Sequence, residues 1–268
     1  MDVKAATVDS EGSIWVTGRL ETTPGEVSSS QLLLLRFDPE SGEVEELHYD
    51  SSASESELGL DVVATEDAVL IAGRARNALG QFRATLWSYD GTEVSVVDSE
   101  ADPFAMDSHA TYNAVTTDLE GRVYLGGSRD DADGVPAAMV RGGEMDAIDE
   151  LFSYTTTSGV DLNDQIRDVA TDAEGNLWFV GYHSEDFSLL GSDSPMFTDW
   201  QLYTGPPTGP FEVVDSFHFS LSLPSFARSV AVHPSGVVFT SGVAMDSAGG
   251  SHLIVRAGNP PDMFTSLD

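Results

Sequence analysis

The chain contains no cysteine among its 268 residues, which excludes a disulfide framework, a cysteine-ligated zinc site and a thiol nucleophile. Basic residues are also scarce, because a single lysine, Lys4, and 11 arginines face 45 aspartates and glutamates, for a formal net charge of −33. A field of this sign repels nucleic acid and anionic membranes. No apolar run approaches the roughly 20 residues of a membrane-spanning helix. We therefore expect no nucleic-acid partner and no membrane span.

The first residues lead directly into a predicted strand, without the apolar segment of a secretory signal. The chain is therefore either cytoplasmic or the mature part of an exported protein. Its acidic composition is typical of secreted bacterial proteins and favours an extracellular or cell-surface location. We expect a monomer, since nothing in the composition requires a partner subunit.

One segment recurs five times along the chain and decides the architecture. Each copy joins two short predicted strands through a tight turn and ends on a glycine. The closing glycines are Gly18, Gly73, Gly127, Gly181 and Gly242. The second copy, Asp61 to Gly73, is two residues shorter at the turn in this alignment. Similar repeats of this length, with several β segments each, are typical of a propeller or β array.

Four predicted strands per repeat indicate an all-β chain folded as a single β-propeller domain over residues 1–268, with five blades of four antiparallel strands. The predicted blades cover residues 1–56, 57–109, 110–162, 163–224 and 225–268. The chain starts on the first strand of a blade and ends on the fourth, so no blade is shared between the termini. Part of a larger propeller is therefore the alternative.

The pattern resembles bacterial propeller repeats of the NHL and SBBP type: a small-residue strand, Asp-x-x-Gly, an aliphatic–aromatic strand ending in Gly, then a Leu-rich strand. The resemblance covers nearly the whole chain and implies a propeller architecture. It implies no single activity, because such propellers serve as binding modules, scaffolds and a few enzymes.

The long, dissimilar loops fall on one predicted face, and the short, uniform turns fall on the other. Variable loops on a rigid scaffold are the usual place for binding, so we expect the ligand or partner at the long-loop face and the channel mouth. Tyr182, in the longest loop region, is a candidate for an exposed aromatic contact. The aromatic and aliphatic side chains at one shared position of the second strand are expected instead to pack between blades. These are Trp15, Leu70, Tyr124, Trp178 and Phe239.

Polar residues recur at one position near the start of the first strand in each repeat, which should line the channel. With the adjacent Asp168, they are our candidate ligand-binding residues: Lys4, Asp61, Asn113, Arg167, Asp168 and Arg228. One interpretation is a positive socket for a small anionic or sugar ligand. The other is a closed network in which Lys4 and the arginines pair with the two aspartates.

Asp130, Asp131 and Asp133 precede Gly134 and are the best metal candidates, because Ca²⁺ prefers several carboxylate oxygens. The segment lacks the remaining ligands of a complete calcium loop. We therefore expect no cofactor, with Ca²⁺ as the alternative.

The sequence favours a non-catalytic propeller that binds a small ligand or a protein over an enzyme. A structural segment of a longer surface protein is the first alternative. The second is a glycosidase-like enzyme that uses channel carboxylates, Asp61 and Asp168. Cationic neighbours are expected to keep both aspartates ionised, which suits a general acid badly.

Overall fold

The computed structural model describes residues 1–21, 30–49, 54–77, 80–100, 109–130, 134–154, 164–185, 197–217, 224–259 and 264–267. These residues form 20 β-strands and no helix, which confirms the prediction of an all-β chain. Within these ranges, accordingly, no helix is long and apolar enough to span a bilayer.

The strands follow one another in groups of four, which we call units 1 to 5. Unit 1 is β1 (Asp2–Val8), β2 (Ile14–Glu21), β3 (Ser30–Phe37) and β4 (Val44–Tyr49). Unit 2 is β5 (Ser54–Ala64), β6 (Val69–Asn77), β7 (Phe82–Tyr89) and β8 (Val94–Glu100). Unit 3 is β9 (Ala110–Thr117), β10 (Val123–Asp130), β11 (Pro136–Glu144) and β12 (Ala147–Tyr154). Unit 4 is β13 (Gln165–Thr171), β14 (Leu177–Glu185), β15 (Phe197–Gly205) and β16 (Glu212–Phe217). Unit 5 is β17 (Ser225–Val232), β18 (Val238–Met245), β19 (Ser251–Gly258) and β20 (Thr265–Leu267).

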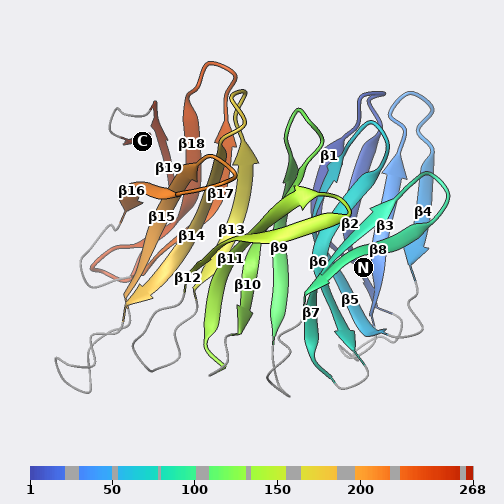
Figure 1. Ribbon diagram of the computed structural model, residues 1–268, viewed down its shortest axis with the longest axis horizontal. Helices are drawn as coiled ribbons and strands as arrows, with labels where there is room; N and C mark the ends of the chain where they lie inside the picture. Colours follow the sequence, from blue (N-terminus) through green and yellow to red (C-terminus); the bar gives the residue numbers. More distant parts are fainter. Residues whose placement is uncertain are drawn as a thin grey trace.

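Each unit is an antiparallel sheet whose strands pair in chain order. Units 1 and 2 are also joined by one parallel pair, Ser30 with Ser56. The first strands of successive units pack on one another, and the second and third strands of each unit pack on the first strand of the next. This succession of small twisted sheets is a β-propeller architecture, as the sequence predicts. Figure 1 shows the units following one another across the molecule, with the N-terminal and C-terminal units on opposite sides.

The recurring glycine is explained by a close approach between the first two strands of each unit. A Cβ atom at any of the five closing glycines would lie 2.0 to 2.2 Å from a carbonyl oxygen of the first strand. That carbonyl lies two residues before a β-bulge, which bends the first strand toward its neighbour. Only a residue without a side chain fits there, so the repeat preserves glycine for packing.

Four apolar clusters hold the units together, one at each junction between successive units. The cluster between units 1 and 2 includes Trp15 and Leu34 on one side and Val62 and Ile71 on the other. Equivalent clusters join units 2 and 3, units 3 and 4, and units 4 and 5. Among the described residues, no such cluster joins unit 5 to unit 1.

The shared position on the second strand packs between units as expected, with one exception. Trp15, Leu70, Tyr124 and Trp178 are 0 to 7% exposed and belong to these clusters. Phe239 is 37% exposed, so the prediction is wrong for the last copy. The reason is tertiary: the other four side chains pack on the following unit, whereas no described unit packs on Phe239.

Candidate active site on the inner strands

We call the first strands of the units the inner strands, because they pack successively on one another. A bulge in each inner strand sets which residues are equivalent. The bulged residues are Lys4, Leu60, Asn113, Arg167 and Arg228. Asp61 therefore corresponds to Asp168, one position later, and not to Arg167 as the sequence alignment has it. The turn of unit 2 spans residues 65–68, against 9–13 in unit 1, so it is one residue shorter and not two.

Asp61 and Asp168 accept equivalent backbone hydrogen bonds, and Asp168 accepts one more from a side chain. In each, one carboxylate oxygen accepts the amide of the following residue at 2.9 Å. The second oxygen of Asp61 accepts the amide of Val115 in unit 3 at 2.9 Å. The second oxygen of Asp168 accepts the amide of Val230 in unit 5 at 2.8 Å and the hydroxyl of Ser229 at 2.7 Å. Each aspartate therefore bridges its own inner strand to the next.

The pKa of Asp61 is raised from 3.8 to about 6, chiefly by burial and also by the negative charge of Asp168, against the hydrogen bonds from Val115 and Val62. Burial also raises the pKa of Asp168, against the hydrogen bonds that it accepts from Val230 and Ser229. Neither carboxylate forms an ion pair with a lysine or arginine that the structure describes. The expectation that cationic neighbours keep both ionised is therefore wrong.

Asn113, in unit 3, makes a similar hydrogen bond from its inner strand to the next one. Its side-chain amide donates to the carbonyl of Ile166 in unit 4 at 2.8 Å. Asp61, Asn113 and Asp168 thus join units 2 to 5 along the inner strands.

The predicted cations of the inner strands do not form the closed network that was the alternative to a socket. Lys4 is exposed and pairs with Asp2, with 3.0 Å between Nζ and the carboxylate. The Arg167 guanidinium lies 5.4 Å from the ring centroid of Tyr182. Its Nε is buried without a hydrogen-bond partner. Arg228 is exposed on β17.

Tyr182 is 8% exposed and packs edge-on against Phe226, with 5.1 Å between the ring centroids. It therefore fills the junction between units 4 and 5, and the prediction of an exposed aromatic contact is wrong. Most of the long loops fall outside the described residues. Binding of a ligand or partner at the long-loop face therefore stays a prediction.

The predicted calcium segment is only partly described. Asp130 is 9% exposed and accepts the amide of His109 at 2.8 Å, which closes the end of β10 against β9. Asp131 and Asp133 lie outside the described residues. Over the described ranges, no group of three or more His, Asp or Glu side chains is arranged to hold a metal ion.

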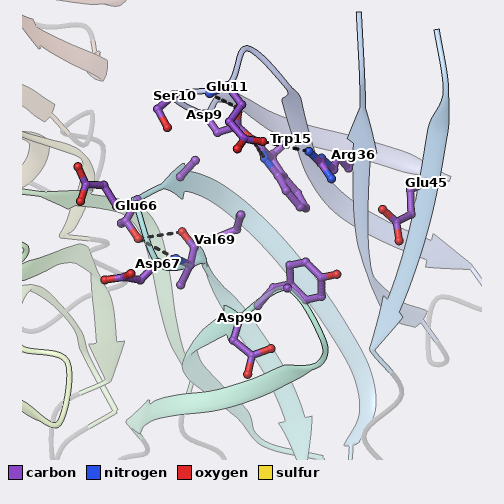
Figure 2. A pocket seen from close by; sticks show the side chains of 15 residues that line it. Asp9, Ser10, Glu11, Trp15, Arg36, Glu45, Glu66, Asp67, Val69 and Asp90 are labelled. Atoms are coloured by element: carbon purple, nitrogen blue, oxygen red, sulfur yellow. Dashed lines mark hydrogen bonds and ion pairs between the residues drawn. The ribbon is translucent and has the colours of Figure 1, made fainter. Parts of the chain in front are cut away.

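A cleft of about 370 Å³ lies between units 1 and 2 on the short-turn face, opposite the face favoured by the sequence. Trp15 and Tyr89 form its floor, with 5.7 Å between their ring centroids, and the Arg36 guanidinium lies 5.6 Å from the Trp15 ring. Figure 2 shows carboxylates around the opening. These are Asp9, Glu11, Glu45, Glu66, Asp67 and Asp90.

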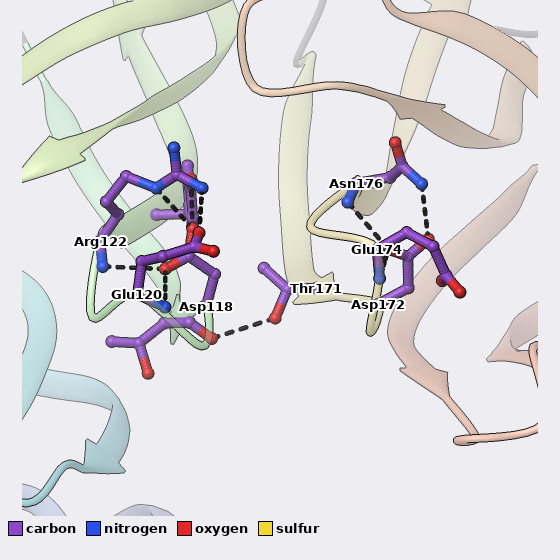
Figure 3. A network of polar contacts seen from close by, with 9 residues as sticks. Asp118, Glu120, Arg122, Thr171, Asp172, Glu174 and Asn176 are labelled. Atoms are coloured by element: carbon purple, nitrogen blue, oxygen red, sulfur yellow. Dashed lines mark hydrogen bonds and ion pairs between the residues drawn. The ribbon is translucent and has the colours of Figure 1, made fainter.

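The short turns on this face are rigid structures in their own right. Asp118 accepts two amides of its own turn and the hydroxyl of Tyr124 at 2.8 Å. Asp172 likewise accepts two amides of its own turn, and it accepts the indole N–H of Trp178 at 2.9 Å. Figure 3 shows both turns and the Thr171 hydroxyl that links them. The turn aspartates therefore fix the junction aromatics, which is a structural role.

Sequence reasoning missed a partly buried group of polar contacts between units 3 and 4. The imidazole of His183 lies 3.1 Å from the hydroxyl of Tyr154 and 3.2 Å from the carboxylate of Asp164. His183 and Asp164 are 8% and 0% exposed. No spacing in the sequence indicates this contact, because the three residues come from different strands or connections.

No protein-family model matches the chain, and no curated protein matches it either. Several solved structures are similar to it. The alpha-L-arabinanase of Penicillium chrysogenum complexed with arabinobiose is 11% identical, with a TM-score of 0.58 over 98% of this chain and 79% of that one. The GH93 alpha-L-arabinofuranosidase of Fusarium graminearum with arabinobiose is 10% identical, with a TM-score of 0.55 over 96% of this chain and 93% of that one. An ulvan lyase of polysaccharide lyase family PL25 is 11% identical, with a TM-score of 0.63 over 97% of this chain and 69% of that one.

At these identities the likeness shows the fold. It nevertheless contradicts the prediction that favours a non-catalytic binding or scaffold module over an enzyme, because these similar structures are glycoside hydrolases and a polysaccharide lyase. Asp61 and Asp168 were expected to be poor general acids because of cationic neighbours. Both instead have raised pKa values, which suit acid–base chemistry. The glycosidase alternative is the one that these findings favour.

Proposed function

We propose that the chain is a glycoside hydrolase whose two working carboxyl groups are Asp61 and Asp168. The observation that carries the proposal is their shared place in the repeat. Both lie one residue after an inner-strand bulge, two units apart, and both have raised pKa values. Glycosidases need one carboxyl group that holds a proton near neutral pH and one that is ionised.

Asp61, whose pKa is raised to about 6, takes the role of general acid. It protonates the oxygen of the leaving sugar while the bond from that oxygen to the anomeric carbon breaks. Asp168 accepts three hydrogen bonds, which stabilise its ionised form. Its carboxylate either attacks the anomeric carbon or takes a proton from the attacking water.

The position of Arg167 beside Asp168 supports a sugar or an anionic sugar as the substrate. Arg167 directly precedes Asp168, and its Nε lacks a partner while its ring neighbour Tyr182 holds the guanidinium in place. A guanidinium so placed suits a hydroxyl or carboxylate of the ligand. The arabinobiose complexes among the similar structures make arabinose-containing glycans the first substrates to test.

The proposed architecture is one propeller domain whose five units are its blades. The bulges, the closing glycines and the four junction clusters repeat in register through all five units, which supports this count. Among the described residues no apolar cluster joins unit 5 to unit 1, so this proposed propeller is not closed by packing of the same kind as its four junctions.

Activity assays on arabinan and on chromogenic α-L-arabinofuranosides test the proposal. We expect Asp61→Asn and Asp168→Asn each to lower kcat by about 10²–10⁴-fold, the usual contribution of a positioned proton donor or acceptor. Asp67→Asn is the matched control, because Asp67 is exposed and lines the cleft on the opposite face. The wild-type profile of kcat/KM should fall as pH rises through about 6, where Asp61 loses its proton.

Two results would overturn this assignment. One is full activity of both asparagine variants, which would move the chemistry elsewhere. The other is product carrying a new double bond, which would show elimination and not hydrolysis. The anomeric configuration of the first product, followed by NMR, then decides whether Asp168 attacks the sugar or activates water.

A further inference from the structure

Units 2 to 4 each use two faces in junctions, and units 1 and 5 each use one. We call the face toward the following unit the forward face and the face toward the preceding unit the backward face. Each of the four junctions places a forward face on a backward face. The forward face of unit 5 and the backward face of unit 1 have no partner among the described residues.

The forward face of unit 5 keeps the apolar character of its equivalents and is exposed. Phe239 is 37% exposed, whereas its equivalents are 0 to 7% exposed. Leu253 is 78% exposed, while Leu32 and Trp200 at the same position of units 1 and 4 are fully buried. Leu267, which pairs with Val255 on the same side of the sheet, is 51% exposed. This surface is therefore a complete half of a junction.

The backward face of unit 1 is the matching half. Val8 is 59% exposed, and Ile14 and Val16 next to it are only partly buried. Their equivalents in unit 2 include Val69 and Ile71, which are 5% and 0% exposed. The same repeat positions are therefore less buried in unit 1, because no described unit packs on this face of it.

We propose that a second copy of this chain covers these faces, with the forward face of unit 5 of one copy seated on the backward face of unit 1 of the next. The argument is continuity, because the same chain carries both halves of a junction that it already forms four times. Exposed apolar surfaces of this kind mark interaction sites. The contact is head-to-tail, since the two halves differ, so it closes into a ring or extends as a chain of copies.

Charge sets the conditions under which the copies associate. Each chain carries a formal net charge of −33, so two copies repel one another at low ionic strength. The Debye length falls from about 30 Å at 0.01 M salt to about 3 Å at 1 M salt. We therefore expect association to strengthen with NaCl, because screening removes the repulsion and leaves the apolar contact. This departs from the monomer that composition alone suggests.

Sedimentation velocity of the full chain at low and high NaCl tests the proposal. The wild type should form dimers or larger species whose fraction rises with concentration and with salt. Leu253→Asp should abolish this by removing the forward face, and Val8→Asp by removing the backward face. Both side chains are exposed, so at low NaCl, where association is weakest, both variants should keep the wild-type Tm. Leu119→Asp is the matched control, because Leu119 is 86% exposed in a turn of unit 3 and should associate like the wild type.

Mixing the two variants gives the decisive result. Each retains one intact face, so an equimolar mixture should form a one-to-one dimer and nothing larger. A wild-type chain that stays monomeric at high salt would overturn the proposal, whether its end faces are open or meet within one chain. A mixture that stays monomeric would overturn the head-to-tail arrangement. Association is read without substrate, so this outcome is independent of glycosidase activity.

Discussion

The inner aspartates combine two tasks in one side chain. Asp61 and Asp168 bridge successive inner strands and also have raised pKa values, because burial penalises their charged forms. A bridging aspartate could serve structure alone. What separates the two roles is the protonation state, which a stability measurement as a function of pH reports directly.

Asp61→Asn should therefore change stability in a pH-dependent way. The folded pKa of Asp61 is about 6 against an ordinary 3.8, so the unfolded chain releases this proton first as pH rises. The stabilising contribution is complete below about 4 and is lost as pH rises through about 6. Asparagine stays neutral throughout. The Tm of the variant relative to the wild type should increase from pH 4 to pH 7.5, measured by calorimetry, and a constant difference would contradict the raised pKa.

Arg167→Ala combined with Arg228→Ala tests ligand recognition at the same inner surface. Neither arginine forms an ion pair with Asp61 or Asp168 in the described structure, so the fold should survive the double substitution. We expect a substrate KM raised about tenfold or more, since a charge-assisted hydrogen bond is worth about 1.5–3 kcal/mol. Arg83→Ala is the control, because Arg83 is exposed on β7. An unchanged KM with the proposed activity intact would remove the arginines from the site.

At the scale of the strands, the closing glycine is the residue that each repeat cannot change. Gly242→Ala would place a Cβ 2.2 Å from the carbonyl oxygen of Phe226 and 2.8 Å from the ring of Trp200. We expect a loss of about 1–3 kcal/mol in the free energy of unfolding, as overpacked sites show. Ser241→Ala, one residue earlier, is the control. Equal urea midpoints for the two variants would show that the first strand moves away without cost.

Much of the architecture is readable from the sequence because its signals are local. The Asp-x-x-Gly turns, the alternating second strands and the closing glycines each depend on a few neighbouring residues, and the structure contains all of them. The alignment failed at Asp61 because one missing turn residue and a bulge shift register together. Tyr182 and Phe239 were misjudged because their exposure depends on the adjacent unit, and His183 because its partners lie far away in sequence. Contacts between units cannot be predicted from the sequence of one repeat alone.

At the scale of the whole molecule, the acidic surface opposes the apolar junctions. The described ion pairs use most of the arginines, among them Arg141 with Asp98 at 2.8 Å and Arg256 with Asp215 at 2.8 Å. The 45 acidic residues nevertheless outnumber the 12 basic ones and leave a formal net charge of −33. The folded chain holds this charge closer together than the unfolded chain does, so repulsion lowers its stability.

We therefore expect the Tm to rise as NaCl is increased from about 0.01 M to about 0.1 M, over which the Debye length falls from about 30 Å to about 10 Å. Screening acts on repulsion between surface carboxylates and less on the partly buried pairs, so the net effect is stabilising. Sucrose is the control, because it stabilises folded proteins by being excluded from their surface and does not screen charge. A rise in Tm at these low NaCl concentrations that sucrose at equal concentration does not reproduce is therefore due to screening. The leading test is the Leu253→Asp variant, which does not associate under the head-to-tail proposal. A rise of its Tm with salt equal to that of the wild type assigns the effect to repulsion within one chain, whereas a rise confined to the wild type would assign it to association.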